Sequence, residues 1–225
     1  MASSLPIIVA LDVPTQTEAL AWVHRLPQVT AWKVGLELFC GEGPAIVRAI
    51  KEQGKRVFLD LKLHDIPNTV AGACRQLRSL EVDWLTLHGS GGPAMLQAAV
   101  EALNHTATTL LAVTALTSLD TATVQAMGLT LPLADWVERL AAQAWRAGIR
   151  GLVCSPQEVG RLRQQLGPTA CLVTPGIRLP GEALGDQQRV ATPQQAIAAG
   201  ASYVVVGRSL LQAPDPERAW QQLSS

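Results

Sequence analysis

Eight short apolar runs recur along the chain, and their spacing is the feature that most limits how it can fold. Each run is uninterrupted rather than alternating and many of the residues are β-branched, which is typical of strands buried on both faces of a parallel sheet. Intervals of roughly 20 to 40 residues between run starts leave room for a helix after most strands. The runs cover residues 7–11, 31–34, 57–61, 84–87, 110–115, 151–154, 171–173 and 203–206.

The segments between these runs carry helix signals. Residues 15–18, Thr-Gln-Thr-Glu, form a capping-box pattern that opens a helix. The pattern recurs at 155–158 and at 192–195, each with Pro at the first helical position, and Gly200 is placed to end the second of these helices. Residues 133–147 form a long amphipathic stretch.

Strands that alternate with helices predict a parallel α/β fold, and a count of eight favours a closed (β/α)8 TIM barrel over an open sheet. No G-x-G-x-x-G motif follows the first run, which argues against a dinucleotide-binding sheet. No compositional shift or low-complexity linker marks a boundary. We therefore expect residues 1–225 to form a single barrel domain.

Composition excludes several classes of protein. Eighteen Lys and Arg balance 18 Asp and Glu, whereas nucleic-acid binding needs an excess of basic residues. The run at 5–11 has no basic segment before it, and no stretch reaches the ~18 apolar residues of a membrane span. Four cysteines without a C-x-x-C pair predict buried, reduced thiols. We expect a soluble, cytoplasmic protein that binds neither nucleic acid nor membrane.

Charged residues lie near the carboxyl ends of the first three predicted strands, where barrels of this kind carry their chemistry. Asp12 follows the first strand, Lys33 lies in the second, and the third continues into Asp60 and Lys62. Because strand side chains alternate between faces, Asp60 and Lys62 share a face opposite the leucines around them. The leucines need the helix layer, so the charged pair should point into the barrel mouth.

An unpaired buried charge is very costly, so these groups should pair with one another. We expect Lys33 to supply a second cation, giving alternating carboxylates and ammonium groups. A single Asp–Lys pair would serve equally well as an ion pair that only fills the barrel mouth. Four charges on three adjacent strand ends favour a functional site, because such clusters concentrate there.

The loops after the last two predicted strands carry a candidate phosphate site, its usual place in this barrel class. Gly207 lets backbone N–H groups approach a phosphate closely, and Arg208 adds a charged donor. Arg178 follows the seventh strand. The alternative is that these loops only form tight turns and that their arginine side chains lie in solvent. The polar connection 176–191 has the length of a lid, which would bring Gln187 onto the phosphate.

Other candidates are less specific. His88, after the fourth strand, either touches a substrate or holds its loop. Thr117 and Ser118, after the fifth, either bind a polar ring edge or cap a helix. The four histidines show no metal-ligand spacing, and no G-x-S-x-G elbow or Cys–His pairing indicates a covalent nucleophile. We therefore expect no metal.

Together these residues resemble the bacterial form of orotidine 5′-phosphate decarboxylase. Residues 60–69, D-L-K-L-H-D-I-P-N-T, are similar to the full D-x-K-x-x-D-I-P-x-T signature of that family. The D-x-K-x-x-D part alone is shared with related sugar-phosphate barrels, whereas the I-P-N-T extension is more specific. Further similar blocks follow in the family's order at 9–12, 33–35, 87–89, 116–118, 174–178, 185–187 and 207–208.

The resemblance implies a carboxy-lyase that converts orotidine 5′-monophosphate (OMP) to uridine 5′-monophosphate (UMP) and CO2, the last step of de novo pyrimidine biosynthesis. It implies no metal and no organic cofactor. Lys62 would be the proton donor, with Asp60, Lys33 and Asp65 completing the charge network. Loss of CO2 from C6 leaves a carbanion without an adjacent carbonyl, which a fixed ammonium can stabilise and then protonate. Repulsion between Asp60 and the departing carboxylate is a further hypothesis.

The resemblance also implies a homodimer with its active sites at the interface, where Asp65 and Thr69 reach the partner's substrate. The matching motifs imply that the substrate is contacted by Asp12, Lys33, Asp60, Ile66, Thr69, Thr117, Ser118, Arg178, Gln187, Gly207 and Arg208. The block at 116–118 is too short to decide between Thr117 and Ser118 for the pyrimidine edge. Two alternatives stay open: a metal-dependent relative, such as a 3-keto-sugar-phosphate decarboxylase or a hexulose-phosphate synthase, and a catalytically silent phosphate-binding barrel.

Overall fold

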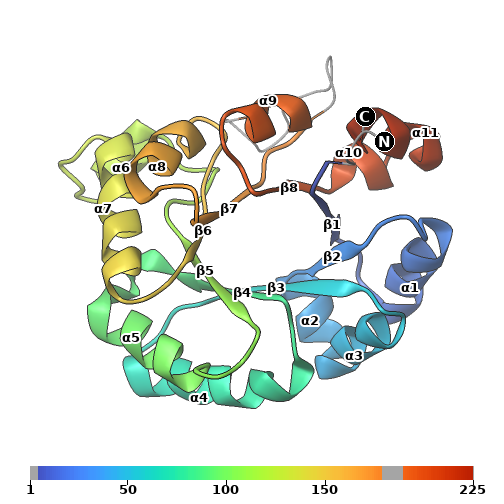
Figure 1. The fold of residues 1–225 in the computed structure, drawn as a ribbon, viewed down its shortest axis with the longest axis horizontal. Coiled ribbons are helices and arrows are strands. Elements are labelled where there is room, and N and C mark those ends of the chain that lie inside the picture. The colour runs from blue at the N-terminus through green and yellow to red at the C-terminus, as the bar shows by residue number, and fades with distance from the viewer. Residues whose placement is uncertain (1–4, 179–189, 225) are drawn as a thin grey trace.

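The computed structural model of the chain describes residues 5–178 and 190–224. Its strands are all parallel and close into a barrel in chain order, with β8 paired to β1, while helices surround them (Figure 1). The predicted (β/α)8 barrel is therefore confirmed. The strands are β1 (Ile7–Leu11), β2 (Ala31–Val34), β3 (Arg56–Leu63), β4 (Trp84–His88), β5 (Thr109–Val113), β6 (Gly151–Val153), β7 (Cys171–Thr174) and β8 (Tyr203–Val206).

Helices occupy the connections between strands and cover the outside of the barrel (Figure 1). Within residues 5–178 and 190–224, none of them is long and apolar enough to cross a membrane. The helices are α1 (Gln16–Arg25), α2 (Leu36–Glu42), α3 (Pro44–Glu52), α4 (Pro67–Leu77), α5 (Gly92–Ala102), α6 (Thr121–Ala126), α7 (Leu133–Arg146), α8 (Val159–Leu166), α9 (Pro193–Ala198), α10 (Arg208–Leu211) and α11 (Pro216–Ser224), with 3-10 turns η1 (Arg78–Leu80) and η2 (Gly89–Gly91).

Strand alternation divides the apolar core into two parts. Outward-facing strand residues pack beneath the helices in one large cluster. Inward-facing residues fill the barrel itself, among them Ile8, Phe58, Trp84, Leu111 and Val173. The interior of the barrel is thus a packed core rather than a channel.

The amino-terminal end of the barrel is closed by aromatic and charged packing. The guanidinium of Arg56 lies 4.0 Å from the centre of the Trp84 ring. The same side chain donates a hydrogen bond to the Tyr203 hydroxyl at 3.3 Å and pairs with Asp83 at 3.1 Å. This end therefore serves stability, and the open end lies at the carboxyl ends of the strands.

Two of the three predicted capping boxes lie at helix starts. Thr15 caps α1 by accepting a hydrogen bond from the Glu18 N–H at 3.3 Å. Thr192 and Gln195 form the full reciprocal box at α9, and Gly200, at φ 112°, follows the end of that helix.

The third predicted capping box is wrong in position, because α8 begins at Val159 rather than at residue 156. The Glu158 carboxylate accepts a hydrogen bond from the Ser155 N–H at 2.9 Å, and the Glu158 N–H donates to the Ser155 carbonyl at 3.1 Å. These bonds close a turn over 155–158, while the buried Ser155 hydroxyl has no hydrogen-bond partner among the described residues. The helix therefore starts three residues late.

All four cysteines are free thiols. Cys74 and Cys154 are buried as expected, and burial raises the pKa of the Cys74 thiol to about 11. The expectation of four buried thiols is wrong for Cys40, which is exposed on α2, and for the half-buried Cys171. Cys40 lies on a short helix that buries Leu38 among its residues, so its thiol faces outward.

Candidate active site

A cavity of about 300 Å³ opens at the carboxyl ends of the strands. That volume is at the lower end of the range of small-ligand sites. Charged side chains line it together with apolar groups such as Phe58, Val153 and Val205. The pocket combines one apolar surface with several fixed polar groups, which suits a ligand with a ring and ionic substituents.

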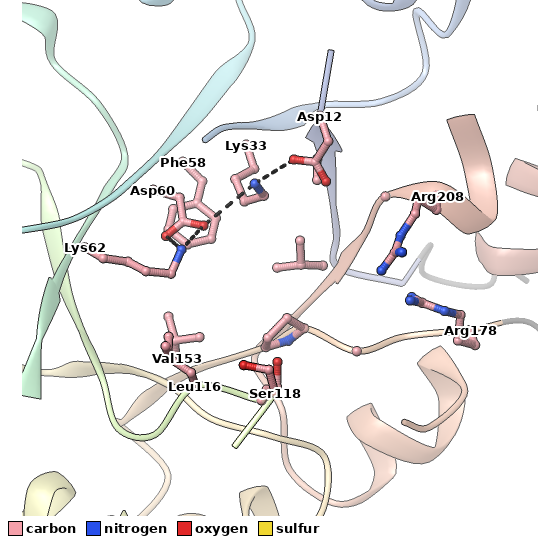
Figure 2. Close-up of a pocket in the computed structure, with 16 residues that line it drawn as sticks. Asp12, Lys33, Phe58, Asp60, Lys62, Leu116, Ser118, Val153, Arg178 and Arg208 are labelled. Atoms are coloured by element: carbon pink, nitrogen blue, oxygen red, sulfur yellow. Dashed lines mark hydrogen bonds and ion pairs between the residues drawn. The ribbon is translucent and has the colours of Figure 1, made fainter. Parts of the chain in front are cut away.

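Four charged side chains form a continuous chain along this cavity, as Figure 2 shows. The Lys33 ammonium lies 3.0 Å from Asp12 Oδ1 and 3.7 Å from Asp60 Oδ2. The Lys62 ammonium lies 2.8 and 2.9 Å from the two Asp60 oxygens. The signs therefore alternate in the order Asp12, Lys33, Asp60 and Lys62, which is the arrangement that the sequence predicts.

The two middle members of this charge chain are largely shielded from water. The side chains of Lys33 and Asp60 are each 12% exposed, whereas those of Lys62 and Asp12 are 31% and 53% exposed. Each buried charge has an oppositely charged neighbour, which compensates for its lost hydration. The two ends of the chain stay open to a ligand.

A bulge in β3 aims Lys62 into the pocket. Leu59 pairs with Leu85 and Leu63 pairs with Leu87, so β3 takes four steps where β4 takes two. Asp60 and Lys62 lie within this bulge, and both line the cavity. Lys62 adopts φ 50°, a conformation rare for residues other than glycine and most often kept at functional sites.

Two arginines lie on the other side of the cavity from Lys62 (Figure 2). Arg178 follows β7 and Arg208 follows β8, and both line the pocket together with Gly207. A Cβ on Gly207 would lie 3.2 Å from Asp12 Oδ2, so a side chain there would crowd the charge chain. The structure thus brings the three described residues of the predicted phosphate site together, while Gln187 lies outside the described residues.

Thr117 and Ser118 also line the cavity. The alternative, that they cap a helix, is wrong. The carboxylate of Asp120 caps α6 instead, accepting a hydrogen bond from the Thr123 N–H at 2.7 Å. The two residues line the cavity and do not cap α6.

Three predicted site residues lie outside this cavity. Asp65, Ile66 and Thr69 belong to the exposed segment 64–69, and Ile66 is 67% exposed. Asp65 Oδ1 accepts a hydrogen bond from the Ile66 N–H at 2.6 Å, and within the described residues Asp65 joins none of the ion pairs. The expected charge network is therefore complete in this chain except for Asp65.

His88 stacks on His64 rather than lining the charged pocket. The ring centres are 5.1 Å apart, and His88 Nδ1 lies 3.3 Å from the Ser90 hydroxyl. Burial lowers the pKa of His88, and the neighbouring His64 and Lys62 lower it further. Of the two roles that the sequence left open, the geometry favours holding the loop.

Sequence reasoning missed several residues of the site. Phe58 and Val153 line the cavity but read as core residues in the sequence. Thr86 contacts Asp60 from β4, and a Cβ on Gly35 would lie 2.9 Å from the Lys33 ammonium. Strand alternation was the available signal for Phe58, which lies two residues before Asp60 and therefore on the same face.

A closed (β/α)8 barrel with a chain of alternating charges at its carboxyl-terminal end defines the class of this protein: a barrel enzyme with an ionic site. The chain belongs to the Orotidine 5'-phosphate decarboxylase / HUMPS family, whose model matches residues 5–223.

Curated relatives agree over nearly the full chain. Orotidine 5'-phosphate decarboxylase from Thermosynechococcus vestitus is 53% identical over 97% of this chain and 94% of its own. The protein of the same name from Thermobifida fusca is 50% identical over 98% of this chain and 94% of its own. A crystal structure of orotidine 5'-phosphate decarboxylase from Lactobacillus acidophilus superposes with a TM-score of 0.86 at 36% identity, covering 97% of each chain.

Proposed function

We propose that this chain decarboxylates OMP to UMP and CO2 without a metal or organic cofactor. The observation that carries the proposal is the alternating chain Asp12–Lys33–Asp60–Lys62 along one side of the cavity. The names of relatives that are about half identical in sequence support the same reaction. No electron-sink cofactor is needed if a fixed ammonium stabilises the carbanion directly.

In the proposed mechanism, the bond between C6 and the carboxylate breaks, and its electron pair stays on C6. The Lys62 ammonium, already held 2.8 Å from Asp60 Oδ1, stabilises this charge without reorganising. Lys62 then donates a proton from Nζ to C6, which gives UMP and leaves a neutral amine. Solvent returns the proton for the next turnover.

Asp60 has two parts in this proposal. Its carboxylate holds Lys62 and Lys33 at 2.8 and 3.7 Å, which fixes both cations before the substrate arrives. It also lies where a substrate carboxylate would approach Lys62, and repulsion between the two anions would vanish as neutral CO2 forms. This second effect is a hypothesis about ground-state destabilisation.

The substrate's other groups fit the remaining lining. The arginines at 178 and 208, with Gly207, lie across the cavity from Lys62 and suit the phosphate. Asp12 and Lys33 lie between these two ends and suit the ribose hydroxyls. Thr117 or Ser118 would meet the pyrimidine edge, and Gln187 would complete the phosphate site.

We further infer a homodimer with shared active sites. The segment 64–69 is exposed at the barrel mouth with Ile66 uncovered, although its Asp65 and Thr69 belong to the signature motif. Met127, which lies close to the pocket residues in the sequence, is also 74% exposed. A second copy covering this surface would place Asp65, Ile66 and Thr69 against the partner's substrate. The proposal includes a cytoplasmic location, as the sequence predicts.

The test is the loss of OMP absorbance with purified protein treated with EDTA. We expect turnover to UMP in the wild type. In Lys62→Ala we expect kcat to fall by more than about 1,000-fold, since one charge and the proton source are both lost. In Arg208→Ala, we expect mainly a higher KM, because phosphate binding is remote from C6. Turnover that disappears with EDTA and returns with a divalent metal would contradict the proposal, as would equal small effects in the two variants.

A further inference from the structure

Thr86 on β4 joins two members of the charge chain from beneath the cavity. Its side chain is completely buried. The hydroxyl accepts a hydrogen bond from the Lys62 backbone N–H at 2.8 Å and donates one to Asp60 Oδ1 at 3.0 Å. Thr86 does not line the cavity, so any effect on a ligand must pass through Lys62 or Asp60.

The direction of both hydrogen bonds follows from the chemistry of the groups. A backbone N–H only donates, so the Thr86 oxygen must accept from Lys62. The single hydroxyl proton is then free to point at Asp60, whose carboxylate accepts it. One hydroxyl thus binds the backbone of Lys62 and the carboxylate that holds the ammonium of the same lysine at 2.8 Å.

We propose that Thr86 is a positioning residue for the decarboxylation, which rests on the function proposed above. Lys62 adopts φ 50° at the bulge, a conformation that costs energy and persists only where neighbouring groups hold it. The Thr86 hydroxyl supplies that support at the N–H of Lys62. It also fixes the Asp60 oxygen that is 2.8 Å from the Lys62 ammonium.

Thr174 on β7 provides a matched comparison. Its side chain is also completely buried, but its hydroxyl has no hydrogen-bond partner among the described residues. Replacing either threonine with valine keeps the shape and removes the hydroxyl. Only the change at Thr86 leaves the Lys62 N–H without its acceptor and removes a donor from Asp60.

The experiment compares Thr86→Val, Thr86→Ser and Thr174→Val with the wild type in steady-state decarboxylation of OMP. In Thr86→Val we expect kcat to fall about 10- to 100-fold with KM within about threefold of wild type, because misplaced reacting groups cost rate rather than ground-state binding. Thr86→Ser, which keeps the hydroxyl, should recover most of kcat. Thr174→Val should behave like the wild type.

If the wild type is active, either of two results would overturn this assignment. One is a kcat for Thr86→Val equal to that of Thr174→Val, and the other is an equal loss of kcat in Thr86→Ser and Thr86→Val. A crystal structure of ligand-free Thr86→Val tests the assignment without turnover. We expect Lys62 to leave its positive φ and its ammonium to move away from Asp60. An unchanged Lys62 would refute the positioning role, whereas an inactive wild type would refute only the proposed function.

Discussion

At the scale of single residues, the site depends on how little space surrounds the Lys33 ammonium. Gly35 lies two residues further along, and a Cβ there would come within 2.9 Å of Lys33 Nζ and 3.8 Å of Asp12 Oδ1. The backbone of Gly35 has φ −92°, which any residue adopts. Glycine is therefore needed here for the space that it leaves to an ammonium group and not for its conformational freedom.

Gly35→Ala should lower activity with little effect on folding. The new methyl group meets the end of a flexible side chain, so Lys33 moves aside at small cost in stability. Displacing that ammonium by about 1 Å should reduce kcat/KM on the order of 100-fold. Gly160→Ala is the control, because its Cβ would lie 3.7 Å from the nearest atom, an ordinary contact. Steady-state kinetics and urea unfolding measure both effects, and a fully active Gly35→Ala would contradict the argument.

The charged residues of the site could be predicted from the sequence, but their uncharged neighbours could not. Asp12, Lys33, Asp60 and Lys62 were visible because a charge at the end of an apolar strand needs a partner. Thr86 carries no such signal, since a threonine in a strand is ordinary and its two hydrogen bonds exist only once β3 and β4 are paired. The contact of Gln187 with a phosphate stays a prediction.

At the scale of elements, β4 contributes side chains along the full length of the barrel. Its inward side chains run from Trp84 at the closed end, through Thr86 beneath the charge chain, to His88 at the mouth. His88 stacks on His64, the residue that follows β3. Burial lowers the pKa of His88 most, and the positive charges that His64 and Lys62 carry when protonated lower it further.

The lowered pKa of His88 predicts a pH-dependent stability. The unfolded chain takes up a proton at His88 near pH 6.5, while the folded chain does so only at lower pH. The unfolded state therefore binds more protons in this window, and the free energy of unfolding should fall as the pH drops below about 6.5. Urea unfolding between pH 5 and 8, the range in which histidine titrates, measures the slope.

His88→Gln should flatten this pH dependence, because the replacement has no titrating ring. His24→Gln, at the exposed end of α1, controls for the loss of an imidazole elsewhere in the chain. An equal slope in the wild type and in His88→Gln would show that another group is responsible.

Strand boundaries could be predicted where the apolar run and the strand coincide. β1, β2 and β8 begin and end at the predicted residues, as the apolar runs suggest. β3 extends two residues beyond its predicted end to Leu63, because pairing with β4 continues past the bulge. The sequence did not predict the bulge, since the extra length depends on β4, which follows more than twenty residues later.

At the scale of the whole molecule, the segments after β2 and β3 expose large apolar side chains at the barrel mouth. The exposed segment 64–69 lies there, and Leu36 and Ile66 are 51% and 67% exposed. Single exposed apolar side chains are common on protein surfaces, but Ile66 lies beside the signature residue Asp65. The proposed homodimer would bury them and would combine Lys62 of one chain with Asp65 of the other in each active site.

Mixing two inactive variants tests whether sites are shared. A dimer of one Lys62→Ala chain and one Asp65→Ala chain would contain one fully damaged site and one intact site. With random exchange at equal amounts, we expect about a quarter of wild-type activity, because half the dimers are hybrids with one working site each. Mixing Lys62→Ala with Lys33→Ala should restore nothing, since both lysines contact Asp60 within the same chain and every site stays damaged. Hybrids detected by native mass spectrometry without recovered turnover would show that each chain builds its own site.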